Sequence, residues 1–153
     1  MTAIAHATIV MERSYDASPA RVFSAWADVE SRKHWSAPAE NIRIEYESAD
    51  FREGGRDFSR CIEQGVADYT AQVHYIDIRQ DRRIVFAEDV AHGGVRVSAA
   101  LTSVELSPRG GGARLLLTMQ IASFDGAEME KGYQFGWSAA LDNLGSHLAG
   151  ANS

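Results

Sequence analysis

The chain has 153 residues, 45% of them hydrophobic and 24% charged, and carries a net charge of −6. This composition is ordinary for a globular protein, and the length suits one domain with its own core, so we expect a single domain over residues 1–153. The acidic balance, with no basic stripe along the sequence, argues against nucleic acid as a partner.

Features that are missing from the sequence indicate the compartment of the protein and whether it contacts a membrane. Cys61 is the single cysteine, so the chain forms no internal disulfide and is compatible with a reducing cytoplasm. The first residues have neither the basic start nor the apolar run of a signal peptide, and no stretch approaches the roughly 18 apolar residues of a membrane span. We therefore expect a cytoplasmic protein that makes no membrane contact.

The first quarter of the chain predicts a strand followed by two short helices. Residues 7–15 are rich in β-forming side chains. Ser18 followed by Pro19 is a strong helix start and predicts a helix to residue 27. Asp28 is a second N-cap and predicts a short helix that ends near Trp35.

From residue 41 the pattern changes to strands. Apolar or β-forming residues alternate with polar ones, and turn-forming Gly, Pro and Asp separate the segments. The short connections predict an antiparallel meander. The predicted strands cover residues 41–50, 56–62, 69–76, 83–88, 95–106 and 113–122.

The last predicted element is a long amphipathic helix from about Glu128 to Ala149. Its apolar residues fall on an arc of roughly 120°. Asp125 has N-cap chemistry, with Glu128 at capping-box spacing. The sequence thus predicts an α+β helix-grip fold, a curved antiparallel sheet of six or seven strands wrapped around this helix. The arc consists of Met129, Tyr133, Trp137, Ala140, Leu141, Leu144 and Leu148, of which we expect Trp137, Leu141 and Leu144 to be buried against the sheet.

Motifs along the whole chain resemble those of one family. The segment 17–26, followed by Trp35, is similar to the opening "ASP-x-x-V-F-x-A-W" of the activator of heat-shock protein 90 ATPase homologue-like family, within the START-like, polyketide cyclase (SRPBCC) superfamily. Residues 51–55 and 77–85 resemble its glycine turn and its "I-D-P-P-x-R-I-V" hairpin, although the prolines are missing here. The C-terminal helix region completes the pattern. The resemblance implies a START-like fold with a ligand that varies between members.

Sequence signatures of catalysis are absent. There is no nucleophile elbow, P-loop, dinucleotide-binding glycine motif or zinc-protease motif. The five histidines are isolated, and none forms a metal-ligand pair with a neighbour. We therefore expect no catalytic residue, no cofactor and no metal.

A cavity between the sheet and the helix is the remaining candidate site. Aromatic residues cluster in the segments that would border it, although each alone also suits an ordinary core. Two polar residues could serve as handles, one on a strand whose facing the sequence leaves open and one on the apolar arc of the helix. The candidates are the aromatic residues Trp26, Trp35, Tyr69, Tyr75, Phe86, Tyr133 and Trp137, with the polar residues His74 and Glu130.

Three functions are compatible with this reading. The first is binding of a hydrophobic or aromatic small molecule that is uncharged or weakly acidic. The second is a cyclase or hydrolase that uses the same cavity, and the third is a chaperone-interacting module, which the family resemblance implies. We also expect a homodimer, because an edge strand and a half-exposed helix face need covering.

Three helix glycines have two possible explanations. Gly132, Gly136 and Gly145 each cost roughly 0.5–1 kcal/mol relative to alanine inside a helix. Either the sheet packs tightly against the helix backbone at these points, or a bound ligand approaches there.

Overall fold

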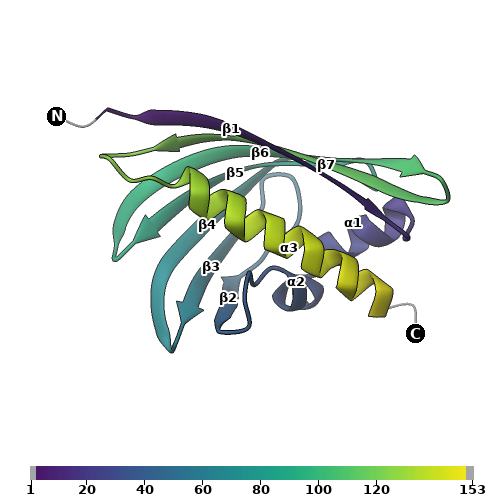
Figure 1. The fold of residues 1–153 in the computed structure, drawn as a ribbon, viewed down its shortest axis with the longest axis horizontal. Helices are drawn as coiled ribbons and strands as arrows, with labels where there is room; N and C mark the ends of the chain where they lie inside the picture. Colours follow the sequence, from purple (N-terminus) through teal and green to yellow (C-terminus); the bar gives the residue numbers. More distant parts are fainter. Residues whose placement is uncertain (1–2, 151–153) are drawn as a thin grey trace.

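The computed structural model describes residues 3–150, apart from the side chains of residues 66–68. Seven strands form one antiparallel sheet in the spatial order β1-β7-β6-β5-β4-β3-β2, and the sheet curves around a long C-terminal helix (Figure 1). The predicted α+β helix-grip fold is confirmed. The elements are β1 (Ala5–Tyr15), α1 (Pro19–Ala27), α2 (Val29–Trp35), β2 (Ile42–Ser48), β3 (Arg56–Glu63), β4 (Val66–Arg79), β5 (Arg83–His92), β6 (Val95–Arg109), β7 (Gly112–Ser123) and α3 (Glu130–Gly150).

The order of the strands follows from the short connections. Strands β2 to β7 form a meander in which each pairs with the next. β1 pairs with β7 along its whole length, from Ala5 opposite Ser123 to Tyr15 opposite Ala113. The α1–α2 excursion carries the chain from β1 to β2 at the far side of the sheet, so these two strands form its edges.

The densest part of the core lies where β7 and the C-terminal half of α3 meet. Every second residue of β7 points inward, and Leu115, Leu117 and Met119 are fully buried. Leu141 and Leu144 of α3 are also fully buried, as predicted. Burial of each such side chain contributes roughly 1.5–3 kcal/mol.

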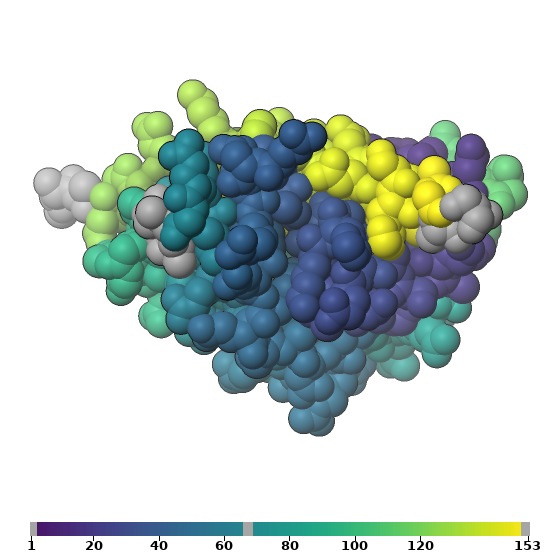
Figure 2. Space-filling model, turned by 90° about the horizontal axis from the view of Figure 1, so that it is seen from below, coloured from purple at the N-terminus to yellow at the C-terminus, as the bar shows by residue number. Residues whose placement is uncertain are grey.

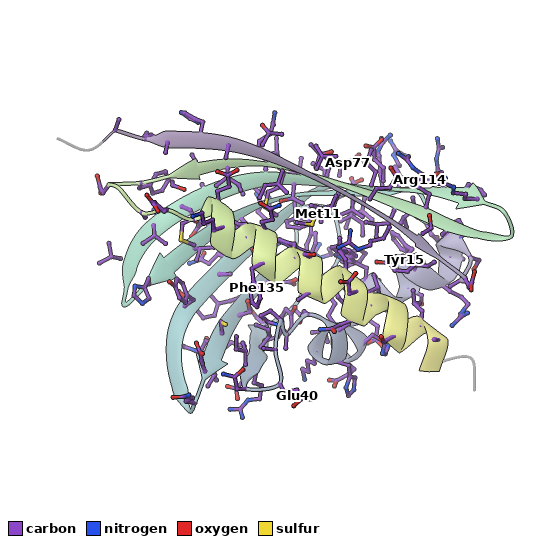
Figure 3. All side chains as sticks on the ribbon, viewed as in Figure 1. Met11, Tyr15, Glu40, Asp77, Arg114 and Phe135 are labelled. Atoms are coloured by element: carbon purple, nitrogen blue, oxygen red, sulfur yellow. The ribbon has the colours of Figure 1, made fainter. Side chains whose placement is uncertain are left out.

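Polar contacts attach β1 to the same half of α3. The Tyr15 hydroxyl donates to the Leu141 carbonyl at 2.7 Å, and Arg13 pairs with Asp142 at 2.9 Å. Met11 and Tyr15 both lie on β1, close to the helix in projection (Figure 3). These bonds hold the edge strand and the helix in a fixed relation.

Hydrogen bonds also attach α3 to α1 and to the segment just after α2. Arg21 of α1 donates to the Leu148 carbonyl at 2.9 Å, and Asn143 donates to the Ala37 carbonyl just after α2 at 2.9 Å. In the space-filling view the blue α2–β2 segment borders the yellow helix α3 (Figure 2). The C-terminal half of α3 is therefore packed on several sides.

The predicted helix α3 is present, but the structure differs from the expectation in three details. The helix begins at Glu130 rather than Glu128, and Asp125 is not its N-cap, because Asp125 lies in a turn with φ +53°. β7 continues to Ser123, so the chain needs this turn before the helix can begin, and Ser123 Oγ accepts a bond from the Met129 amide. Trp137 is half-buried rather than buried, because it borders an open space.

Candidate functional site

A cavity of about 410 Å³ lies between the N-terminal half of α3 and the inner face of β2–β5. Its volume is in the range of ordinary small-molecule sites. The helices contribute Trp26, Arg32, Trp35, Met129, Gly132, Tyr133, Gly136, Trp137 and Ala140 with the neighbouring Ser36, Pro38 and Glu128, and the strands contribute Ile44, Tyr46, Asp57, Ser59, Cys61, Tyr69, Thr70, Ala71, Val73, Phe86, Glu88 and Val90.

Aromatic rings form a continuous wall of this cavity. Trp137 stacks on Trp26 with ring centroids 5.6 Å apart, and Trp26 packs on Trp35 at 4.9 Å. Phe86 of β5 continues the wall, 6.4 Å from Trp137. Large flat surfaces of this kind suit an aromatic or alicyclic ligand.

The helix glycines separate into two groups. A Cβ at Gly145 would lie 3.2 Å from the Tyr15 ring, so tight packing explains that glycine. Gly132 and Gly136 line the cavity, and a Cβ on either would meet no atom within 4 Å. Packing inside the protein does not require glycine at these two positions, and their lack of side chains keeps the cavity open.

A buried polar cluster closes the α2 end of the cavity. Arg32 Nη1 donates to Asp57 Oδ2 at 2.6 Å and to the Tyr75 hydroxyl at 2.8 Å, and that hydroxyl also bonds Asp57. Asp57 Oδ1 accepts from the Asp50 amide at 2.9 Å. The Arg32 guanidinium carbon lies 5.0 Å from the centre of the Tyr46 ring.

Electrostatics favour the ionised form of Arg32. Burial works against its charge, but interactions with Tyr75, Tyr46 and Asp57 outweigh that effect and raise the pKa of Arg32 above its ordinary value. Burial also raises the pKa of the Tyr75 hydroxyl. Arg32 is therefore a permanent cation at the cavity wall, and the Tyr75 hydroxyl behind it keeps its proton, which it donates to Asp57.

Glu88 is the second acidic side chain from a strand that borders the cavity. It shares the inward face of β5 with Phe86 and Val90, and among the described residues it has no hydrogen bond or ion pair. Burial, reinforced by the charge of Asp89, raises the pKa of the Glu88 carboxyl to about 7. Near neutral pH this group can therefore either donate or accept a proton.

The predicted site residues divide between the cavity and its surroundings. Trp26, Trp35, Tyr69, Phe86, Tyr133 and Trp137 line the cavity. Tyr75 lies just behind the wall, where its ring packs on Phe86 with centroids 6.1 Å apart and its hydroxyl bonds Arg32.

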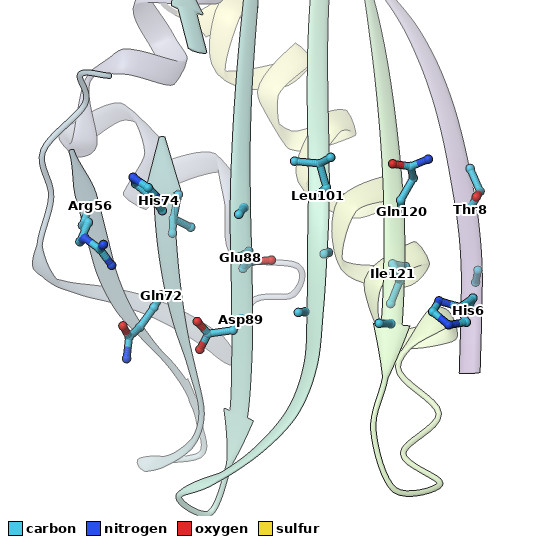
Figure 4. A pocket seen from close by; sticks show the side chains of 16 residues that line it. His6, Thr8, Arg56, Gln72, His74, Glu88, Asp89, Leu101, Gln120 and Ile121 are labelled. Atoms are coloured by element: carbon cyan, nitrogen blue, oxygen red, sulfur yellow. The ribbon is translucent and has the colours of Figure 1, made fainter. Parts of the chain in front are cut away.

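The two predicted polar handles do not reach the cavity. His74 points to the opposite face of the sheet, because residues alternate along β4 and Tyr75 takes the inward position. There it borders a shallow groove with Gln72 and Asp89, with α3 behind the sheet (Figure 4). Glu130 is exposed at the first residue of α3.

The actual polar residues were missed for identifiable reasons. Glu88 was taken as the end of its strand, whereas extending the alternation from Ile84 and Phe86 to Val90 places it inward. Asp57 shares the inward face of β3 with Ile62, on either side of a bulge between Cys61 and Ile62 that interrupts the simple alternation. The contact of Arg32 with Asp57 joins positions 25 residues apart, and no local pattern reports such a pair.

Metal and membrane signatures are also absent from the part of the chain that the structure describes. No group of three His, Cys, Asp or Glu side chains in residues 3–150, outside 66–68, could hold a metal ion. Within the same described residues, no helix is long and apolar enough to cross a membrane.

The fold and the cavity together define a START-like helix-grip protein. Residues 16–149 match the family described as "Activator of Hsp90 ATPase homolog 1-like protein", and the chain belongs to that family. Among proteins of curated function, none matches the chain.

Solved structures from bacteria share this fold over nearly its full length. An uncharacterized protein from Rhizobium leguminosarum is 33% identical, with a TM-score of 0.88, over 96% of this chain and 97% of that one. The Mll3558 protein from Rhizobium loti is 38% identical, with a TM-score of 0.85, over 95% and 99%. The CV1439 protein from Chromobacterium violaceum is 23% identical, with a TM-score of 0.80, over 92% and 96%, which shows the fold alone.

Proposed function

We propose that the protein binds a hydrophobic or aromatic small molecule in the cavity between the sheet and α3. The observation that carries the proposal is the aromatic-walled cavity of about 410 Å³ between the sheet and α3. Gly132 and Gly136 support it, because their backbone adjoins open space that a ligand would fill. Burial of apolar ligand surface supplies the affinity, at about 25 cal/mol per Å² before association costs.

Intrinsic fluorescence tests this proposal directly. All three tryptophans of the chain, Trp26, Trp35 and Trp137, line the cavity. We expect uncharged aromatic probes such as 2-ethylnaphthalene and 2-acetylnaphthalene to change the tryptophan emission with micromolar dissociation constants. If no probe in a broad aromatic and fatty panel binds more tightly than millimolar, the proposal fails.

A cavity-filling variant shows where the probes bind. Gly136→Leu places a side chain in the open space, so we expect at least tenfold weaker binding. Replacing a glycine inside a helix also stabilises the helix by roughly 0.5–1 kcal/mol, so weaker binding by this variant cannot be attributed to unfolding. The matched control is Gln134→Leu, which adds the same side chain at an exposed position of the same helix and should leave binding unchanged.

A second candidate function is acid–base catalysis in the same cavity. The observation that favours it is the Glu88 carboxyl, whose pKa of about 7 suits proton transfer at neutral pH. Mass spectrometry of a bound ligand before and after incubation checks this candidate. Conversion that disappears in Glu88→Gln while binding persists would support it, and an unchanged ligand would exclude it for that compound.

The family description also raises a chaperone-interacting role. Such a role would use an exposed surface instead of the cavity. We rank it below ligand binding because a surface interaction gives no role to the aromatic wall of the cavity. Pull-down of purified heat-shock protein 90 by the wild type and by Gly136→Leu distinguishes the two, since a surface interaction is indifferent to the filled cavity.

A further inference from the structure

One wall of the cavity carries hydrogen-bond donors that have no acceptor. Among the described residues, four buried side-chain atoms lack a hydrogen-bond partner, namely Arg32 Nε, Arg32 Nη2, Ser36 Oγ and Thr102 Oγ1. Three of these four atoms belong to Arg32 and Ser36, and both residues line the cavity at its α2 end. The Ser36 side chain also interacts with the neighbouring Tyr46 hydroxyl, so Arg32 Nε and Nη2 are the donors that carry the argument. Thr102 lies in the core and does not border the cavity.

The missing acceptors are costly for the protein. Arg32 is only 5% exposed, and Nε and Nη2 together carry three N–H groups. Its Nη1 already donates hydrogen bonds to Asp57 and Tyr75. The Tyr46 ring lies over a face of the guanidinium and does not accept hydrogen bonds from the N–H groups in the guanidinium plane. A buried donor without a partner costs roughly 1–3 kcal/mol, and more for a charged group. Several unpartnered donors lie together on one wall of the cavity, which indicates that a bound molecule supplies their acceptor.

The charges around this wall specify the kind of acceptor. Asp57 already neutralises Arg32 through a contact of 2.6 Å. Across the sheet Asp57 pairs with Val73, and Val73 pairs with Glu88, which places the Glu88 backbone roughly 10 Å from that of Asp57. An anionic ligand would add a negative charge to a cavity that is already lined by the acidic residues Asp57, Glu88 and Glu128 and by the cation Arg32. An uncharged oxygen supplies the hydrogen bonds without that repulsion.

We propose that the Arg32–Ser36 wall binds an uncharged carbonyl-type oxygen of the ligand, such as that of a ketone, ester or amide, while the ligand's apolar body lies against the tryptophan wall. This inference rests on the proposed function and refines its ligand class. The polar handles of the ligand are then Arg32 and Ser36 at the α2 end of the cavity, in place of the expected His74 and Glu130, which do not line it.

Three probes with one ring system test the proposal in the wild-type protein. They are 2-acetylnaphthalene, 2-ethylnaphthalene and 2-naphthoate, measured by tryptophan fluorescence at pH 8. We expect the ketone to bind about tenfold more tightly than the hydrocarbon, since one satisfied buried donor is worth about that factor, and also more tightly than the carboxylate. Equal affinity for the ketone and the hydrocarbon would overturn this proposal but would leave the proposal of ligand binding intact. Tighter binding of the carboxylate would show that the acceptor is not uncharged. If none of the three probes binds, both proposals fail.

Variants then locate the donors. Arg32→Lys keeps a cation for Asp57 but loses the forked donors, so the preference for ketone over hydrocarbon should fall to about twofold or less. Ser36→Ala should reduce it by several fold without disturbing the ion pair. The matched control is Arg21→Lys, the same exchange at an arginine that bonds the Leu148 carbonyl outside the cavity, and the preference should not change. If the preference for ketone over hydrocarbon is undiminished in both test variants, Arg32 and Ser36 are not the donors. If Arg32→Lys does not fold, the Ser36→Ala variant and the three probes decide the question.

Discussion

At the scale of the residue, the cavity combines an aromatic wall with a buried ion pair between Arg32 and Asp57. The rings of Trp26, Phe86 and Trp137 were predictable, because large side chains on periodic apolar faces must point inward. Arg32 and Asp57 were not, because a buried ion pair is defined by a contact between distant segments, and each residue alone reads as surface charge. Six of the seven aromatic candidates line the cavity, whereas both polar candidates lie elsewhere.

Glu88 should make the stability of the protein depend on pH. Its pKa rises from 4.5 in the unfolded chain to about 7 in the folded protein, chiefly through burial. Between these values the folded state binds more protons, so the free energy of unfolding falls as pH rises from about 4.5 to 7. Glu88→Gln removes this term, and the variant should be more stable than the wild type at pH 8 but not at pH 4.

Chemical denaturation across this pH range checks the prediction. The difference between the wild type and Glu88→Gln isolates Glu88, because the histidines titrate in both proteins. Glu40→Gln is the matched control, because it makes the same exchange at an exposed glutamate outside the cavity and should leave the pH dependence of the wild type unchanged. A difference that stays constant from pH 4 to pH 8 would contradict the raised pKa.

At the scale of the element, α3 consists of two halves with different tasks. The C-terminal half is held by α1, α2 and β1, whereas the N-terminal half lines the cavity with Gly132, Tyr133, Gly136 and Trp137. The apolar arc predicted the existence and the length of this helix but not this division. Periodicity reports which residues point inward, and it does not distinguish packed protein from open space.

Two truncations on α3 should therefore have different costs. Leu144 is fully buried, and Leu144→Ala should lower the free energy of unfolding by about 2–5 kcal/mol. Trp137 is half-buried beside the cavity, so Trp137→Ala should cost about 1–2 kcal/mol, less than the 3–5 kcal/mol of a tightly packed aromatic residue.

Urea unfolding followed by circular dichroism measures both costs, because Trp137→Ala removes one of the fluorophores. A loss for Trp137→Ala as large as that for Leu144→Ala would mean that the cavity closes around Trp137 in solution. Saturating 2-acetylnaphthalene should raise the stability of the wild type more than that of Trp137→Ala.

At the scale of the whole molecule, most of the fold was readable in advance. Each turn signal fell between predicted strands, and short connections leave few alternatives to a meander. The strand ends were less accurate, since β5 continues to His92 and β6 to Arg109. Edge geometry and long twisted hairpins extend pairing past the residues where local β-propensity ends.

The two edges of the sheet differ in a way that bears on assembly. The β2 edge exposes the charged residues Arg43, Glu45 and Glu47, which discourage pairing with another chain. The β1 edge instead exposes an apolar side chain, Val10, at 61%. We expect a homodimer in which two β1 strands pair antiparallel and extend the sheet.

Sedimentation equilibrium at micromolar concentration measures this association. Val10→Lys would place two like charges near each other across an antiparallel β1–β1 interface, so we expect the variant to be monomeric. The matched control is Val95→Lys, which adds the same charge at an equally exposed valine on β6, away from the β1 edge, and should leave the dimer intact. If the wild-type protein sediments only as a monomer, the dimer is ruled out. If the dimer persists in Val10→Lys, its interface lies elsewhere, and the exposed Phe135 of α3 is the next residue to substitute.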